Sequence, residues 1–183
     1  MSGNNNDATI TEGTWEDNSL KFTTSNSSNG VKTNSNFPID FNNTFNIVFE
    51  LSRVKSVEAL FGSRTTSSNG MMLFNYSDNN KLTLDTIGSS TRIEIGDRLV
   101  ANTRYDISVT FENTTVKLYV NGTLRNTMSF TDGTINFPLT IFTAATRANA
   151  LGNIYSVKVY DRALTDEEVL QNYNLDMERY ADS

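Results

Sequence analysis

The ionisable side chains of this chain restrict the chemistry that it can perform. Its 183 residues include no His and no Cys, against 21 Asp and Glu. Histidine is the commonest general base near neutral pH, and cysteine supplies thiolate nucleophiles and zinc ligands. Any catalysis would therefore depend on carboxylates, and any metal site would need oxygen ligands.

The carboxylates are not spaced for catalysis by an acidic pair. A retaining glycosidase needs two carboxyl groups about 5–5.5 Å apart, but the residues two positions from Glu94 are not acidic. Asp166 and Glu168 are two residues apart, immediately after Thr165. Thr165 and Glu168 have the spacing of a capping box, and acidic residues favour the first turn of a helix. We therefore predict that the protein is not an enzyme.

A ligand site would need an aromatic platform with a few placed polar groups. Tyr76 lies close to Asp78, Asn79 and Asn80, between two expected strands. The tyrosine could stack on a ligand, and the amides could bond to hydroxyl groups. We predict this rim loop as the ligand-binding site; the alternative is a solvated turn with Tyr76 packed inward.

Two further aromatic residues could stack on a ligand. Tyr119 lies on the polar side of its strand beside Lys117, and it is the second ligand-binding candidate. The alternative to a binding role for Tyr119 is that its ring is buried beneath a covering loop. Trp15 is expected to pack against the edge of the sheet structure instead.

Oxygen-rich loops could also hold a hard cation. The candidate segments are residues 78–80, Glu16-Asp17-Asn18 and Asp132. Ordinary turns use the same residue types, because Asx side chains bond their own backbone. We therefore predict no cofactor and no metal, with calcium as the alternative.

Period-two alternation of apolar and polar residues is the main structural signal. It indicates strands over 45–51, 105–112, 116–121 and 135–141. Asn121-Gly122 predicts a two-residue hairpin turn, because both positions of a type I′ turn need positive φ. A strand over Ile154–Tyr160 precedes a helix that starts at about Asp166, with Leu164 and Val169 spaced as a hydrophobic staple. Many short strands at this spacing favour an antiparallel sandwich or barrel.

Composition limits the partners and the number of domains. The net charge is −6 and the pI is about 4.6, so nucleic acid is not an expected partner. There is no signal-peptide pattern and no apolar run long enough for membrane insertion. We predict a single domain over 1–183, with a polar leader over 1–18, sandwich strands over 19–163 and a closing helix over 164–180. The polar segment 24–36 is also expected to be a loop.

Several segments, in family order, resemble laminin-G-like domains of the concanavalin-A-like lectin/glucanase superfamily. They are FNIVFE from Phe45, LFGS from Leu60, the stretch from Asn102 to Gly122, and the closing strand and helix from Gly152. The resemblance implies an all-β, two-sheet antiparallel jelly-roll sandwich with a short C-terminal helix. Arg104 and Asp106 replace the family's Trp and His, and Tyr155 and Ser156 replace its acidic pair.

The resemblance implies two functions of different classes. The first is a non-catalytic recognition or adhesion module that binds glycan or another cell-surface polymer. The alternative is a structural or decoration component of a bacteriophage virion or tail with no small ligand, in contact with other virion or surface proteins. The superfamily's glucanases carry a Glu-x-Asp-x-Glu run, which this chain lacks. We expect the protein on an extracellular surface or in a virion.

Overall fold

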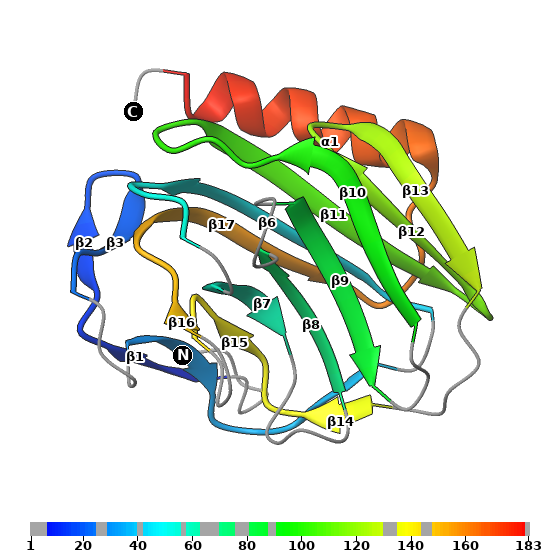
Figure 1. Cartoon of the computed structure of the whole chain (residues 1–183), viewed down its shortest axis with the longest axis horizontal. Helices are drawn as coiled ribbons and strands as arrows, with labels where there is room; N and C mark the ends of the chain where they lie inside the picture. Colours follow the sequence, from blue (N-terminus) through cyan, green and yellow to red (C-terminus); the bar gives the residue numbers. More distant parts are fainter. Residues whose placement is uncertain are drawn as a thin grey trace.

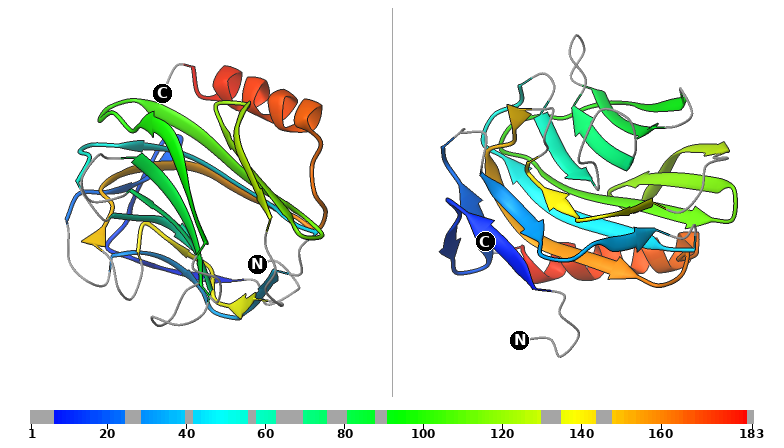
Figure 2. Two further views of the ribbon diagram at one scale, coloured as in Figure 1. Left: turned by 45° about the vertical axis from the view of Figure 1, so that its right-hand side comes forward. Right: turned by 90° about the horizontal axis from the view of Figure 1, so that it is seen from below.

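The structure is a computed structural model that describes residues 7–24, 29–39, 42–55, 58–62, 70–75, 81–87, 91–129, 135–143 and 148–181. Its strands form two large sheets that face each other, with one helix outside them (Figures 1 and 2). This confirms the predicted two-sheet antiparallel sandwich with a C-terminal helix. The described part of the chain contains no helix that is both long and apolar enough to cross a bilayer.

The first sheet has eight described strands. In spatial order, seven of them are β1 (Ala8–Thr11), β4 (Gly30–Thr33), β15 (Thr140–Ile141), β7 (Glu58–Gly62), β8 (Gly70–Asn75), β9 (Lys81–Ile87) and β10 (Thr91–Arg98). The eighth, β16 (Ala148–Asn149), runs parallel to β7. The other pairs in this sheet are antiparallel.

The second sheet has seven described strands. Its order is β13 (Thr123–Ser129), β12 (Thr115–Val120), β11 (Arg104–Glu112), β6 (Thr44–Leu51), β17 (Gly152–Tyr160), β3 (Ser19–Phe22) and β2 (Thr14–Glu16). A separate short pair joins β5 (Phe37–Ile39) to β14 (Ile135–Phe137). The predicted run over 135–141 is therefore divided: β14 and β15 belong to different sheets, on either side of Pro138.

The core lies between the inner faces of the two sheets. Phe45 and Phe49 of the seven-stranded sheet meet Phe61 and Phe142 from the opposite side, with ring centroids 5.3 and 6.1 Å apart. All four rings are buried. Such aromatic pairs contribute to stability beyond the burial of their apolar area. They therefore help to hold the two sheets together.

The β11–β12–β13 meander follows the predicted alternation. Val109 pairs with Leu118, and Phe111 pairs with Val116, all four with buried side chains. Asn121 and Gly122 have φ values of 50° and 70°, as the two-residue turn between β12 and β13 requires. The predicted hairpin and its inward face are confirmed.

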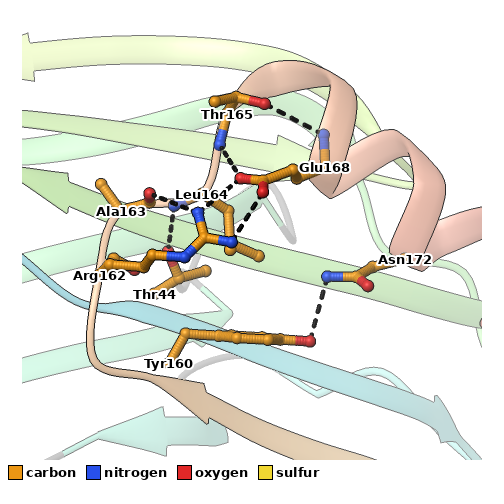
Figure 3. A network of polar contacts seen from close by, with 8 residues as sticks. All are labelled: Thr44, Tyr160, Arg162, Ala163, Leu164, Thr165, Glu168 and Asn172. Carbon is orange, nitrogen blue, oxygen red and sulfur yellow. Dashed lines mark hydrogen bonds and ion pairs between the residues drawn. The ribbon is translucent and has the colours of Figure 1, made fainter.

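The helix α1 (Asp166–Arg179) lies on the outer face of the seven-stranded sheet (Figure 1). Its predicted capping box is present: the Glu168 N–H donates to Thr165 Oγ1 (3.3 Å), and the Thr165 N–H donates to Glu168 Oε2 (2.9 Å), as Figure 3 shows. Arg162 also binds both Glu168 carboxylate oxygens at 2.7 Å, which lowers the pKa of Glu168 to about 2. The carboxylate is therefore fixed as part of the helix start.

Apolar contacts and hydrogen bonds attach the start of α1 to the sheet. Leu164 and Val169, the predicted staple, are buried with the ring of Tyr119. The Leu164 N–H donates to Thr44 Oγ1 (2.9 Å), and Asn172 Nδ2 donates to the Tyr160 hydroxyl (3.1 Å; Figure 3). The helix is therefore a packed cover over β6, β12 and β17.

The structure corrects the predicted polar leader and loop. Residues 8–11 and 14–16 form β1 and β2, and residues 30–33 form β4. These strands are short and lie at or near the sheet edges, so they need few buried residues. Pairing with neighbouring strands overrides their weak local propensity.

Candidate functional site

A groove of about 430 Å³ opens at the side of the sandwich where β1 and β4 approach β2, β3 and β17. Its volume lies within the range of roughly 300–1,000 Å³ that is typical of small-molecule sites. The apolar part of its lining comes from both sheets and includes Ile10, Leu20, Val31, Ile141, Ile154 and Val157. None of the described lining residues is charged.

The indole ring of Trp15 lies at the groove with 70% of its residue surface exposed. Trp15 pairs with Leu20, and directly paired residues share a face, so its side chain is on the inner, groove side of β2. β2 is the last described strand of its sheet, so no described strand lies beyond it next to the ring. The expectation that Trp15 packs against the edge is therefore wrong: most of its surface faces solvent.

A tight turn explains how two short strands reach different sheets. Glu12, between β1 and β2, has a φ of 57°, and Gly13 follows it. A Cβ atom on Gly13 would lie 2.9 Å from side-chain atoms of Ile10, Leu20 and Phe22, so only glycine fits there without a shift. This turn sends β1 to one sheet and β2 to the other, and it places Ile10 and Trp15 at the same groove.

Polar side chains near Trp15 lie on the other face of the strand pair. Glu16 accepts from Lys21 Nζ (2.8 Å) and from Asn153 Nδ2 (3.2 Å). These bonds use the carboxylate of the Glu16-Asp17-Asn18 segment that was considered for calcium. Inside the groove, Thr33 Oγ1 donates to the Ser35 carbonyl oxygen and accepts from the Leu139 N–H, each at 2.9 Å.

Of the predicted ligand-binding residues, Tyr76, Asp78, Asn79 and Asn80 lie outside the described part of the chain. The loop therefore stays a prediction. Asp132, considered with them for calcium, also lies outside it. The described residues contain no group of three acidic side chains that could hold a metal ion.

Tyr119 lies beneath α1 with only 1% of its surface exposed. Its hydroxyl donates to Asp166 Oδ1 (2.7 Å), and burial raises its pKa to about 12. A ring covered on both faces offers no platform for stacking. Tyr119 is therefore a buried packing residue, which was the alternative to a binding role, and it is covered by α1 and not by the expected loop.

A buried carboxyl pair that the sequence did not indicate lies between α1 and the sheet. Asp106 and Asp176 face each other there, and each is 2% exposed. Asn46 Nδ2 donates to Asp106, and Lys158 pairs with Asp176. Burial, followed by the charge of Asp176, raises the pKa of Asp106 to about 7. The helix closes this cluster from solvent, so a substrate cannot reach it.

The two-layer sandwich and its closing helix define a concanavalin-A-like jelly roll. The family model of the concanavalin A-like lectin/glucanases superfamily, in its laminin-G-like branch, matches residues 25–170. The chain belongs to this family. A comparison with curated proteins finds no match.

Solved structures of low sequence identity share the fold. Domain 4 of AbnA, an extracellular GH43 arabinanase from Geobacillus stearothermophilus, in complex with arabinotriose, has a TM-score of 0.69 at 15% identity, over 84% of this chain and 75% of that one. The CBM40 of the Ruminococcus gnavus IT-sialidase, bound to α2,3-sialyllactose, has a TM-score of 0.61 at 10% identity, over 78% and 97%. Trypanosoma rangeli sialidase has a TM-score of 0.70 at 15% identity, over 93% of this chain but only 29% of the sialidase.

Proposed function

We propose that this protein is a non-catalytic recognition module that binds glycan on a cell surface or an extracellular polymer. The observation that carries the proposal is the exposed indole ring of Trp15 beside an uncharged groove. An exposed aromatic ring can stack on the apolar face of a sugar, and few residues present so much apolar area with so little loss of entropy. Carbohydrate ligands in two structures of the same fold support this choice.

The described carboxylates support a role without catalysis. Glu168 completes the capping box, and Asp166 accepts from Lys117 and Tyr119. Asp106 and Asp176 are buried beneath the helix, and Glu16 is paired with Lys21. Glu94 lies 3.7 Å from Lys81 at a partly exposed position. None of these groups lines the groove, whereas a glycosidase needs two carboxyl groups on either side of the scissile bond.

A glycan array, screened with and without calcium, followed by titration of the best glycan, tests the proposal. The chain has one tryptophan, so its fluorescence reports on Trp15 in the parent and in variants that keep this residue, whereas binding by Trp15→Ala is measured by calorimetry. We expect Trp15→Ala to weaken binding at least about fivefold, since stacking of one nucleic-acid base on an aromatic side chain contributes on the order of 1–3 kcal/mol. The control is Val100→Ala, another exposed apolar residue that is absent from the groove lining. Equal binding by both variants would exclude the groove.

The same titration tests the predicted loop at Tyr76. A Tyr76→Ala, Asn79→Ala double variant that stays folded and binds as tightly as the parent would identify the loop as an ordinary turn. A loss of binding in this variant, with Trp15→Ala unaffected, would move the site from the groove to the loop.

One observation favours the structural alternative, a component of a phage virion or tail. Leu170 and Leu175 of α1 are 47% and 54% exposed, and Leu124 on β13 is 40% exposed. Exposed apolar side chains of this kind favour contacts with other proteins. Under this alternative, the array is negative, and a Leu170→Ser, Leu175→Ser variant fails to assemble with the particle while remaining folded.

A further inference from the structure

The hydrogen-bond pattern of the seven-stranded sheet determines which main-chain groups of β17 remain open. The Phe111 N–H donates to the Asn43 carbonyl oxygen (2.8 Å), so alternate residues of β6, starting with Phe45, bond to β11. The intervening residues of β6 bond to β17, opposite Tyr160, Lys158 and Ser156. The N–H and C=O groups of Val157 and Val159 therefore point away from β6.

The neighbouring strand does not reach these groups. On that side, β3 pairs only with Gly152–Ile154, at one end of β17 (Figure 1). The Tyr155 carbonyl accepts the Tyr180 hydroxyl (3.1 Å), but the structure shows no described residue that bonds to the main chain of Val157 or Val159 on this side. The side chains of both valines line the groove. The groove thus combines an apolar surface with an open strand edge.

We propose that this groove binds the acetamido group of a neutral N-acetylated sugar, an inference that rests on the glycan function proposed above. An acetamido group carries an N–H, a C=O and a methyl group, which is the chemistry of a peptide unit. Its C=O can accept a hydrogen bond from the open Val157 N–H, as a carbonyl of a neighbouring strand would, while its methyl group enters the apolar groove. The sugar ring then lies at the mouth, where Trp15 can stack on it.

Charge selects against acidic and amino sugars. The described lining offers no Lys or Arg to pair with a carboxylate, and no Asp or Glu to pair with an ammonium group. The ion pair of Glu16 with Lys21, which is next to Trp15 in the strand pair, lies on its opposite face. An unpaired charge in an apolar groove is costly. The overall charge of −6 further disfavours anionic glycans.

An extended polypeptide is the other ligand that pairs with an open strand edge. The sugar is favoured because β17 offers main-chain groups of only two residues on this side, and because an exposed indole ring lines the same groove. A peptide that binds as an added strand would gain most of its affinity from a longer series of main-chain hydrogen bonds. The experiment below separates these two occupants.

The test compares ligands that share a neutral β-1,4-linked backbone. Titrations of Trp15 fluorescence with N,N′,N″-triacetylchitotriose and with cellotriose should give at least tenfold tighter binding for the N-acetylated sugar. De-N-acetylated chitotriose, which is cationic, should bind at least tenfold more weakly than its acetylated parent. If array-positive glycans bind but the acetyl group makes no difference, this inference fails and the glycan function stands. If no glycan binds, the proposed function itself fails.

Binding of an N-acetylated tripeptide amide without binding of the sugar would assign the edge to polypeptide and overturn the inference.

Variants of the groove provide an independent test. Val157→Pro removes the open N–H without removing a bond to β6, and Val157→Ala controls for the lost side chain. The preference for the N-acetylated sugar should fall in the proline variant and persist in the alanine variant. Ile10→Asn should also reduce it, whereas Leu124→Asn, at a position of similar exposure outside the groove, should not. Retention of the full preference in both Val157→Pro and Ile10→Asn would contradict the proposal.

Discussion

Asp106 is an acidic residue held in surroundings that oppose its charge. Its neighbours are Asn46 on β6, Lys158 on β17 and Asp176 on α1, and its pKa is raised from 3.8 to about 7. In the unfolded chain this carboxyl ionises near 3.8, whereas in the folded protein it keeps its proton up to about pH 7. Between these values the folded state binds more protons, so its stability increases as the pH falls.

We therefore expect the contribution of Asp106 to the free energy of unfolding to fall between about pH 4 and pH 7 and to stay low above pH 7. The difference between 3.8 and about 7 corresponds to roughly 4 kcal/mol. Asp106→Asn, which is always neutral, should be more stable than the parent at pH 8 and similar to it below about pH 4. Urea unfolding at several pH values measures this difference.

The control for Asp106→Asn is Glu178→Gln, at an exposed position of α1, the helix that covers Asp106. That variant should follow the parent at every pH, because an exposed carboxylate is well hydrated. If the profiles of Asp106→Asn and the parent ran parallel from pH 5 to pH 8, the buried acid would not be the source of the pH dependence.

The ring of Phe111 fills the core between the two sheets. It is fully buried and meets Phe45 edge to face, with centroids 6.0 Å apart. Phe111→Ala should lower the free energy of unfolding by about 3–5 kcal/mol, because it removes apolar contacts and leaves a cavity. Leu124→Ala, at an exposed position, should change it by roughly 0.5 kcal/mol or less. Thermal unfolding that is unchanged in Phe111→Ala would show that this face is not the inner one.

At the scale of elements, the start of α1 can be tested without altering the core. Thr165 is exposed, and its hydroxyl accepts the Glu168 N–H. Thr165→Ala should cost about 1 kcal/mol and should speed hydrogen exchange in the first turn of the helix. Thr123→Ala, an exposed threonine on β13, is the control. Unchanged exchange in Thr165→Ala would mean that Arg162 and Glu168 hold the helix start without the hydroxyl.

The elements differ in how far their sequences predict them. The β11–β12 hairpin and the capped helix were predictable because the pattern, turn and cap each depend on residues close in sequence, such as Asn121-Gly122 and Thr165 with Glu168. By contrast, β1 and β2 hold few apolar residues, and their pairing with β4 and β3 depends on partners elsewhere in the chain. The exposure of Trp15 was missed for the same reason: it depends on β2 being an edge strand.

At the scale of the whole molecule, both the buried pair of Asp106 with Asp176 and the groove depend on contacts between elements that are distant in sequence. The sequence shows Asp106 as an ordinary polar residue on the outer face of a strand. Its changed pKa requires α1 to cover that face and to bring Asp176 to it. Similarly, the groove requires β1 and β2 to enter different sheets. Neither feature is encoded in one segment.

The position of β17 has a consequence for biosynthesis. It follows every other described strand along the chain, yet it lies inside its sheet, between β6 and β3. While the protein emerges from the ribosome, β6 and β3 therefore have open edges until β17 is synthesised. Open edges of this kind favour aggregation, and pairing between distant segments is slow.

A chain cut after Ala150, which lacks β17, should therefore aggregate or be degraded, as soluble yield and gel filtration would show. A chain cut after Asp161 keeps β17 without the helix and should retain cooperative unfolding, although with lower stability. A soluble, cooperatively unfolding chain that ends at Ala150 would contradict this account. Until β17 has been made, then, the nascent domain holds a sheet in which β6 and β3 each have an unpaired edge.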